Sequence, residues 1–307
     1  MSLKVDMDEF EGSQSHDQSL AAVVLPAREA ILGEGMKIRR LLPHRKQRMI
    51  GAWCFFDHAG PADVKQGLGM RVGPHPHTGL QTFSWMMDGE ILHRDSLGYT
   101  QLLEKGQVNL MTAGKGISHS EESPSNRSSM LQLAQFWIAL PDQYRFIEPG
   151  FKHYPHLPCI VEEKIRITVL VGELLGQRSP VQVYSPLVGL DIQTQGEAQL
   201  TLPLKTKFEY GVAVLTGSAT VDGKELLPGA LLYLGKGHAQ VALVTTEESQ
   251  IIVIGGEPFA EDIMMYWNFV GRNKAEIQEY IRLWHDTDYF GVVEGYDGEP
   301  IRSPELK

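Results

Sequence analysis

Three turn signals occur in the same order in both halves of the chain, and they constrain its fold more than any other sequence feature. In the first half they are Met87-Asp88-Gly89, Lys105-Gly106 and Gly114-Lys115-Gly116; in the second they are Leu215-Thr216-Gly217, Pro228-Gly229 and Gly235-Lys236-Gly237. Each signal separates short strand-like runs, and Asp88-Gly89 is also typical of a β-hairpin. The repetition favours two related antiparallel β modules, the second covering about residues 165–256.

The 307 residues are enough for two domains of ordinary size. We expect a polar, mobile N-terminus (1–30), a first module (31–150), a connection (151–164), a second module (165–260) and a C-terminal extension (261–307). In the extension, Asn273 and Glu276 form the pattern of a helix N-cap and its capping-box partner. Apolar residues follow at helical spacing, which predicts a short helix over about residues 274–285.

The charge balance and the cysteine content limit the partners of this chain. With 28 Lys+Arg against 38 Asp+Glu the formal net charge is −10, so direct nucleic-acid binding is not expected, because it requires a basic surface. No run reaches the roughly 18 apolar residues of a membrane helix, and the acidic start lacks the pattern of a secretion signal. Cys54 and Cys159 are too few for a disulfide framework. We therefore expect a cytoplasmic protein that does not bind membranes.

Two short motifs carry side chains that can bind a metal ion. Pro-His-Pro-His-Thr-Gly contains His75 and His77, and Gly-Ile-Ser-His-Ser-Glu contains His119 and Glu121. Alternate residues of a strand project from the same face, so each pair can point at one spot. A single His-x-His pair is weak evidence, because exposed chance pairs are common. The second pair, 42 residues later (119 − 77), makes a metal site the better interpretation.

The combined motifs would offer three imidazoles and one carboxylate. Imidazole suits Fe, Ni, Cu or Zn, and an added carboxylate favours the harder ions of that set. Four protein ligands leave two positions open on a six-coordinate ion, enough for a bidentate substrate or for a substrate and dioxygen. The open positions favour a catalytic site over a purely structural one.

These motifs resemble the cupin signatures and, more closely, those of the pirin family. The first cupin signature is matched by Gly69, His75, His77 and Gly89, and the second by Gly106, Thr112, Gly114 and His119, with Thr112 where many cupins have Pro. The similarity to pirins covers Phe56-Asp57-His58, His75-Pro76-His77, residues 93–98, 111–121 and 135–141, and Trp267-Asn268-Phe269-Val270-Gly271. These segments occur in the family's order.

The resemblance implies an all-β fold of two cupin (jelly-roll-like) β-barrels that face each other, here followed by the short C-terminal helix. It implies that only the first barrel binds metal, usually iron, through His75, His77, His119 and Glu121. Several pirins show quercetin 2,3-dioxygenase activity, whereas nuclear eukaryotic members act as transcriptional cofactors.

The leading hypothesis is therefore a metal-dependent dioxygenase, an oxidoreductase that cleaves a small flavonol-like aromatic substrate with dioxygen. Fe(II) is the expected ion, with Ni, Cu, Mn, Co and Zn as alternatives. We expect Glu121 to be the catalytic residue, which binds the ion and accepts the proton of the substrate hydroxyl. The alternative is a non-catalytic iron-binding redox sensor or regulator that acts through protein partners, for which the same motifs would serve.

Two polar residues are candidates for contact with the substrate or support of the metal ligands. Gln81 occupies a position where pirins usually carry Glu, and an amide cannot ionise, so the motif has a single carboxylate. This difference puts activity on flavonols in question if a second acid is needed. His58 lies in the Phe-Asp-His segment near the expected barrel mouth and is a candidate for lining the pocket.

A third polar candidate and several aromatic residues have two interpretations each. His93 forms an i, i+2 pair with Asp95, which suits a role beside the metal, although a solvent-exposed strand face is the more common arrangement for such a pair. Phe56, Phe83 and Trp85 are candidate pocket walls, with ordinary strand core equally open for the last two.

The second module lacks metal-binding side chains at the matching positions. Counting from the corresponding glycines gives Pro203, Lys205, Gln240 and Ala242. None of the four could rebuild the site, so we expect the second module to be structural.

Overall fold

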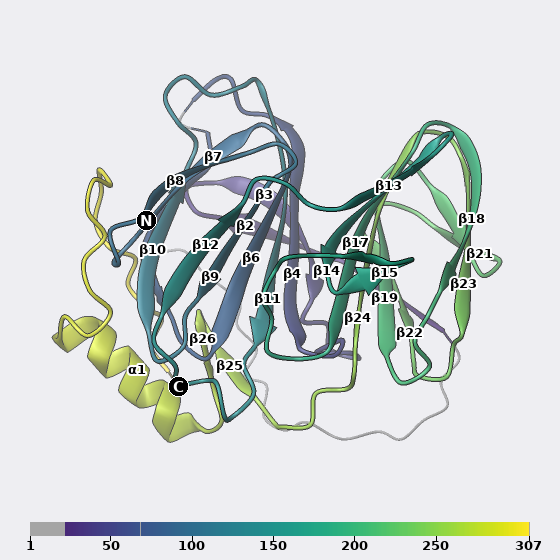
Figure 1. Ribbon diagram of the computed structural model, residues 1–307. Coiled ribbons are helices and arrows are strands. Elements are labelled where there is room, and N and C mark those ends of the chain that lie inside the picture. Colours follow the sequence, from purple (N-terminus) through teal and green to yellow (C-terminus); the bar gives the residue numbers. More distant parts are fainter. Residues whose placement is uncertain (1–21, 68, 307) are drawn as a thin grey trace.

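The computed structural model describes residues 22–67 and 69–306, and they form two β modules that lie side by side (Figure 1). Each module contains a seven-stranded sheet and a four-stranded sheet. Every strand pair within these sheets is antiparallel, as the turn signals predict. The described part of the chain has no helix with the length and apolar character of a membrane span.

The first module holds the strands nearest the metal motifs. Its seven-stranded sheet contains, in spatial order, β12 (Gly150–Tyr154), β9 (Val108–Thr112), β6 (Leu80–Asp88), β11 (Met130–Ala139), β4 (Trp53–Asp63), β3 (Met36–Leu42) and β2 (Arg28–Leu32). Its four-stranded sheet contains β5 (Arg71–His77), β10 (Ile117–Glu122), β7 (Glu90–Asp95) and β8 (Thr100–Glu104).

The second module repeats this strand order. Its seven-stranded sheet contains β1 (Val23–Pro26), β22 (Ala230–Leu234), β19 (Glu209–Thr216), β24 (Ser249–Gly256), β17 (Leu187–Thr194), β14 (Ile165–Val171) and β13 (Cys159–Glu162). Its four-stranded sheet contains β18 (Glu197–Pro203), β23 (Gln240–Thr246), β20 (Ala219–Val221) and β21 (Lys224–Leu226). Two further hairpins are β15 (Glu173–Leu174) with β16 (Gln177–Arg178), and β25 (Met264–Tyr266) with β26 (Phe269–Gly271). The matching orders confirm two modules of one jelly-roll type.

The turn at Asp88-Gly89 is present, but the expected hairpin is wrong. Strand β6 pairs with β9 and β11, whereas β7 pairs with β10 and β8. Gly89 therefore carries the chain from one sheet to the other. Its φ is +77°, and a Cβ there would lie 2.2 Å from the carbonyl oxygen of Met130, so only glycine fits this bend.

The two seven-stranded sheets face each other and share one apolar core. Phe56, Phe83 and Phe136 of the first module belong to the same buried cluster as Leu170 and Ile252 of the second. Both faces of each large sheet are thus covered, one inside its own module and one between the modules. Burial on both faces removes the alternation of polar and apolar residues that would identify each face from the sequence.

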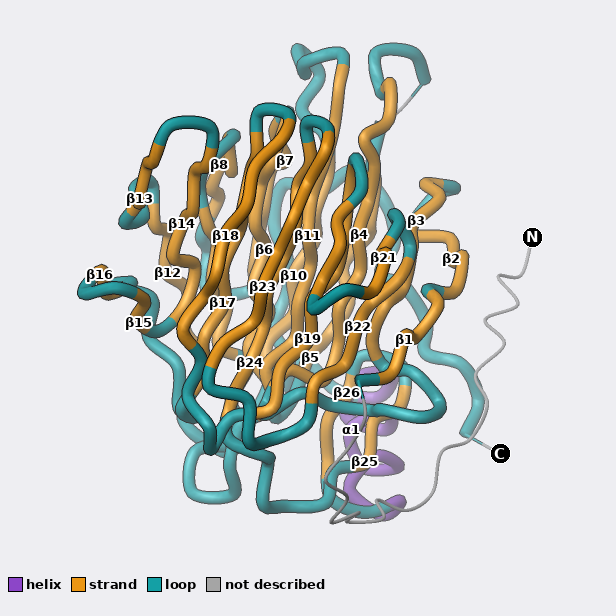
Figure 2. Tube along the Cα trace, turned by 90° about the vertical axis from the view of Figure 1, so that its right-hand side faces the viewer, coloured by secondary structure: helices purple, strands orange, loops and turns teal. Residues whose placement is uncertain are grey.

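The N-terminal expectation is wrong for residues 23–30. The segment Val23–Pro26 forms β1 and pairs with β22 of the second module, and the next strand, β2, lies at the edge of the first (Figure 2). Residues 1–21 lie outside the described part of the chain. Strand β1 therefore joins the sheet of the second module, which comes later in the chain. Strand β12 lies at the corresponding edge of the first module's sheet.

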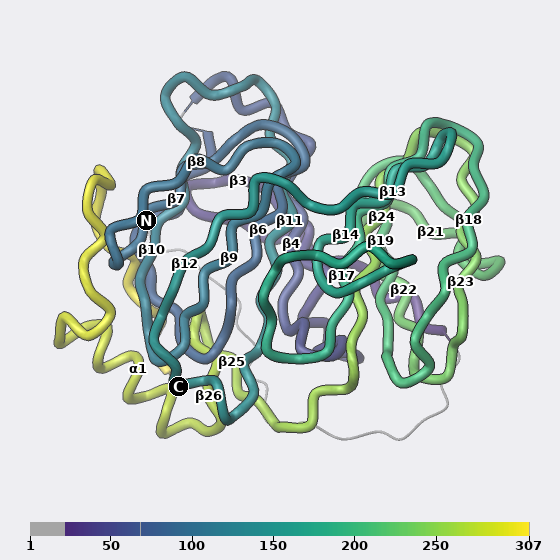
Figure 3. Tube along the Cα trace, viewed as in Figure 1, coloured from purple at the N-terminus to yellow at the C-terminus, as the bar shows by residue number. Residues whose placement is uncertain are grey.

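The C-terminal extension returns to the first module, as Figure 3 shows for the yellow segment near β10. Helix α1 (Lys274–Asp286) is confirmed, and the Asn273 side chain accepts a hydrogen bond from the Glu276 amide at 3.0 Å. A parallel bridge joins Thr78 to Phe269. The extension therefore lies beside the first metal motif.

Candidate metal centre

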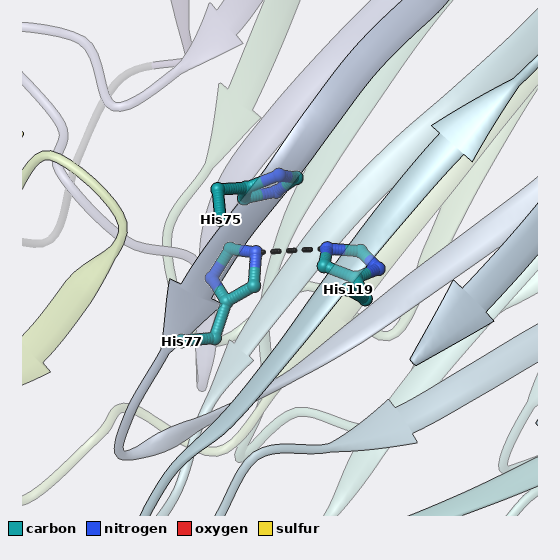
Figure 4. A group of neighbouring side chains, drawn as sticks. All are labelled: His75, His77 and His119. Carbon is teal, nitrogen blue, oxygen red and sulfur yellow. Dashed lines mark hydrogen bonds between the residues drawn. The ribbon is translucent and has the colours of Figure 1, made fainter. Parts of the chain in front are cut away.

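The two metal motifs lie on neighbouring strands of the small sheet in the first module. His75 of β5 is directly opposite His119 of β10, and His77 is opposite Ile117. Exposed fractions are 6% for His75, 1% for His77 and 1% for His119. All three imidazoles are therefore taken out of water and point toward one another (Figure 4).

The three histidine rings surround one spot. Their centroids lie 4.5–5.0 Å apart, and one ligand atom from each ring lies within 4.8 Å of the others. The Nε2 atoms of His77 and His119 approach to 3.1 Å, the contact dashed in Figure 4. One cation between these two ring nitrogens could be bound by both of them.

Backbone carbonyl groups orient two of the rings. His75 Nδ1 donates to the Gly73 carbonyl oxygen at 2.8 Å, and His77 Nδ1 donates to that of Asn268 at 3.0 Å. A carbonyl oxygen only accepts, so the hydrogen of each ring lies on Nδ1 and the lone pair on Nε2 faces the centre. Asn268 is in the C-terminal extension, so that segment supplies one of the groups that orient the candidate ligands.

The surroundings keep these imidazoles neutral, the form that binds metal ions. Burial lowers the pKa of His75 to about 4. Burial, together with neighbouring histidines, holds the pKa of His77 and of His119 well below the usual value.

The nitrogen positions fit two adjacent ligands of one ion. Metal–imidazole bonds of about 2.1 Å at a right angle place their nitrogens about 3.0 Å apart, close to the 3.1 Å between His77 and His119. The donor set and its spacing therefore suit a divalent transition-metal ion.

Glu121 lies near this group but faces a second one. Its carboxylate groups with His119 and His93, each offering a ligand atom within 4.8 Å of the others. The register between β10 and β5 shifts after His119, so that Glu121 is opposite Val72. On the other side, Glu121 is directly opposite His93 of β7.

Burial raises the pKa of the Glu121 carboxyl group, while His93 and a hydrogen bond from Ser84 act in the opposite direction. The Ser84 hydroxyl lies 3.3 Å from Glu121 and 2.7 Å from the Gln135 side-chain oxygen. Glu121 is therefore a carboxyl group that can hold or release a proton near the histidine cluster.

The expectation of an exposed strand face at His93 and Asp95 is wrong. Both residues are buried at 2% exposure, and His93 lies beside the cluster. The structure brings together His75, His77, His119, Glu121 and His93 from the candidate residues.

Gln81 does not lie beside the histidine cluster. Its side chain donates to the Thr112 hydroxyl at 2.9 Å and to the Gln182 carbonyl at 3.1 Å, between the modules. The next residue, Thr82, is opposite Trp137, which contacts His77. Gln81 therefore lies on the face of β6 that is turned away from the histidines, and a direct contact with a metal-bound substrate is not supported.

His58 and the three aromatic candidates also lie on strand faces that are turned away from the histidine cluster. Phe56, Phe83 and Trp85 belong to the core between the modules. His58 Nε2 lies 3.2 Å from the Gln132 side-chain nitrogen, which donates to Gln250 of the second module. These residues hold the modules together instead of lining the centre.

The aromatic wall of the centre consists of residues that sequence reasoning missed. Trp137 meets His77 edge-on, with centroids 5.1 Å apart. Phe55 stacks on Trp137 at 4.1 Å and 13°. No polarity signal distinguishes them, because Phe55 and Trp137 adjoin Phe56 and Phe136, which are equally apolar and face the other way.

The corresponding strands of the second module turn apolar side chains inward. Strands β18 and β23 match β5 and β10, and their buried residues include Leu202, Val241 and Leu243. The counted positions Pro203 and Gln240 face outward and are exposed. Counting from the glycines was therefore one residue out of register, and the inward positions are filled by core.

Two jelly-roll modules of matching strand order define a bicupin, and both groups of metal-competent side chains found in the described residues lie in its first module. Residues 35–138 match the family model Pirin, and residues 189–290 match the Pirin C-terminal cupin domain.

Similar proteins agree with this assignment. A Pseudomonas aeruginosa protein provisionally named quercetin 2,3-dioxygenase is 45% identical over 95% of this chain and 92% of its own. A pirin-like protein of Caulobacter vibrioides is 34% identical over 85% of this chain and 92% of its own. A crystal structure of quercetin 2,3-dioxygenase from Acinetobacter baumannii is 44% identical, with a TM-score of 0.90 over 93% of this chain and 96% of that one. The chain belongs to the pirin family.

Proposed function

We propose that this protein is a metal-dependent dioxygenase that cleaves a flavonol-like substrate in the manner of quercetin 2,3-dioxygenases. The convergence of the His75, His77 and His119 rings in a buried site, with the Nε2 atoms of His77 and His119 3.1 Å apart, carries the proposal. The 44% identity to a quercetin 2,3-dioxygenase over almost the whole chain supports the reaction class.

The proposed ligands are His75, His77, His119 and Glu121, with Fe(II) as the ion. A bound divalent ion of this kind would supply a site for adjacent substrate oxygens and for dioxygen, and would favour the ionised hydroxyl. Glu121 can join the three histidines if its side chain turns from His93 toward His75.

Glu121 is also the proposed acceptor of the substrate proton. Its pKa is raised by burial, so the carboxylate is a better base than an exposed one. Ser84 can donate to the remaining carboxylate oxygen. The proton would thus pass from the substrate hydroxyl to an Oε atom of Glu121.

The aromatic wall would orient a flat substrate and keep water out. Phe55 and Trp137 form a stacked pair beside His77. Aromatic rings of a ligand gain from offset or edge contacts with such a pair. The proposed setting is the cytoplasm, which agrees with the free thiols of Cys54 and Cys159.

The test is to load the protein with Fe(II) without oxygen, add quercetin and then oxygen, and follow flavonol absorbance and carbon monoxide release. The proposal expects turnover above that of free iron, and its loss in His75→Ala. Asp191→Asn, a buried change in the second module, should retain the activity. Iron binding with no turnover would reject the enzyme and favour the alternative, an iron-binding regulator that acts through protein partners.

A further inference from the structure

His93 and Asp95 form a buried pair on β7, directly beside the proposed ligands. In the register of β10 with β7, Asp95 is opposite His119 and His93 is opposite Glu121. The His93 ring also stacks on Phe151, with centroids 4.4 Å apart and planes 16° from parallel. The ring is thus held by packing as well as by hydrogen bonds.

The carboxylate of Asp95 is fixed by three donors. One oxygen accepts from the backbone amides of Leu97 at 2.9 Å and Tyr99 at 3.1 Å. The other lies 3.0 Å from His93 Nε2. A carboxylate only accepts, so in the neutral His93 ring the hydrogen lies on Nε2 and Nδ1 carries a lone pair.

That lone pair determines the hydrogen position in the next ring. His93 Nδ1 lies 3.4 Å from Nδ1 of His119. His119 Nδ1 must then be the donor, which leaves a lone pair on its Nε2. This Nε2 is the atom that lies 3.1 Å from His77 Nε2.

We propose that Asp95 and His93 are positioning residues that fix the tautomer of His119 and so direct its Nε2 lone pair at the metal. They do for His119 what the carbonyls of Gly73 and Asn268 do for His75 and His77. The inference rests on the proposed function, in which His119 is a ligand. Partners of this kind tune the basicity and orientation of metal-binding histidines.

Asp95→Asn is a sharp test because it keeps the shape and reverses the hydrogen bonds. The amides of Leu97 and Tyr99 require an oxygen, so the amide nitrogen of the substituted side chain must face His93 and donate to its Nε2. His93 then carries its hydrogen on Nδ1 and donates to His119. His119 is left with its hydrogen on Nε2, where the lone pair for the metal should be.

The first measurement is made on the metal-free protein at about pH 8, by long-range ¹H–¹⁵N NMR of the histidine rings, with His119 assigned from His119→Gln. Wild type should show the Nδ1–H form of His119, and Asp95→Asn should show the Nε2–H form. Identical tautomers in the two proteins would overturn the proposal. Because no metal is present, this result is independent of the proposed function.

The second measurement is Ni(II) affinity by calorimetric titration. Asp95→Asn should weaken binding by about 10–100-fold, the usual effect of losing such a partner. Asp191→Asn, the matched buried carboxylate of the second module, should bind as wild type does. Loss of affinity with an unchanged His119 tautomer would overturn the relay and place the ion on His93 instead. Absence of Ni(II) and Fe(II) binding in wild type would reject the proposed function alone.

His93→Phe separates positioning from packing. Phenylalanine retains the stack on Phe151 but leaves His119 free to adopt either tautomer. Its affinity loss should therefore be smaller than that of Asp95→Asn, which enforces the wrong tautomer. An equal or larger loss in His93→Phe, with thermal unfolding matched between the variants, would contradict the relay.

Discussion

The buried carboxyl group of Asp191 should make the stability of this protein depend on pH in a way that one isosteric change removes. Asp191 of β17 has no exposed surface. Its two oxygens accept from the side-chain amides of Gln250 and Gln193, each at 3.0 Å. Burial nevertheless dominates and raises the pKa of Asp191 from 3.8 to about 6.

The magnitude follows from that shift. A rise from 3.8 to about 6 is worth about 3 kcal/mol, because each pKa unit corresponds to about 1.36 kcal/mol. The folded pKa of Asp191 is the higher one, so its contribution to stability is fully present below 3.8 and is lost as the pH rises through about 6. An asparagine side chain at this position has the same shape but cannot ionise. Its amide nitrogen cannot accept the hydrogen bond that one of the two glutamines donates, and this loss is the same at every pH. We therefore compare the free energy of unfolding of Asp191→Asn with that of wild type at each pH. The variant minus wild-type difference should be larger at pH 8 than at pH 3, by up to about 3 kcal/mol.

The assay is urea unfolding of the metal-free proteins at several pH values. His58 is linked to this network through Gln132, and burial lowers its pKa to about 4. Both proteins retain His58, so its opposite pH trend cancels in the comparison. Glu225→Gln removes a surface charge and should give a constant difference from wild type. A difference between wild type and Asp191→Asn that does not change with pH would refute the reasoning.

Two further changes test the placement of Gln81 and the close approach of the two modules. Gln81→Glu should lower stability by about 1–3 kcal/mol, because a carboxylate cannot donate to the Gln182 carbonyl oxygen. It should not raise turnover, because the side chain lies away from the histidines; a faster reaction in the flavonol assay would show that a missing acid lies at this position. Gly51→Ala should cost about 1–3 kcal/mol in urea unfolding, since its φ is +53° and a Cβ would lie 2.8 Å from Gly256 Cα across the module boundary. Gly98→Ala, also at positive φ but in open space, should cost less, and equal losses would contradict the close approach.

The repeated turn signals were sufficient to predict two β modules and their antiparallel strands. The helix at the C-terminus was also predictable, because Asn273 and its capping partner act within one turn. Signals of this kind depend only on residues that are neighbours in the sequence, so they can be interpreted without knowledge of the fold.

The faces of individual strands could not be predicted. Phe55 and Phe56 are adjacent and both buried, yet one faces the centre and the other the second module. The prediction that Gln81 and His58 line the pocket fails because the sequence does not show which face of each strand they occupy. A strand covered on both sides has no alternation of polarity from which to choose, and a one-residue error reverses every side chain.

Contacts between segments that are distant in the sequence could not be predicted either. Val23 pairs with Tyr233, and the Asn268 carbonyl orients His77 across 191 residues. No local signal marks Asn268 as a partner of the centre. Pairings of this kind depend on how the modules and the C-terminal extension pack together.

The most direct test of the account is the position of the ion. Crystals grown without oxygen in the presence of Fe(II) should give one anomalous peak at the iron edge, within bonding distance of Nε2 of His75, His77 and His119. Glu121 should have turned toward that peak. A peak between His93, His119 and Glu121, or in the second module, would contradict the proposed centre.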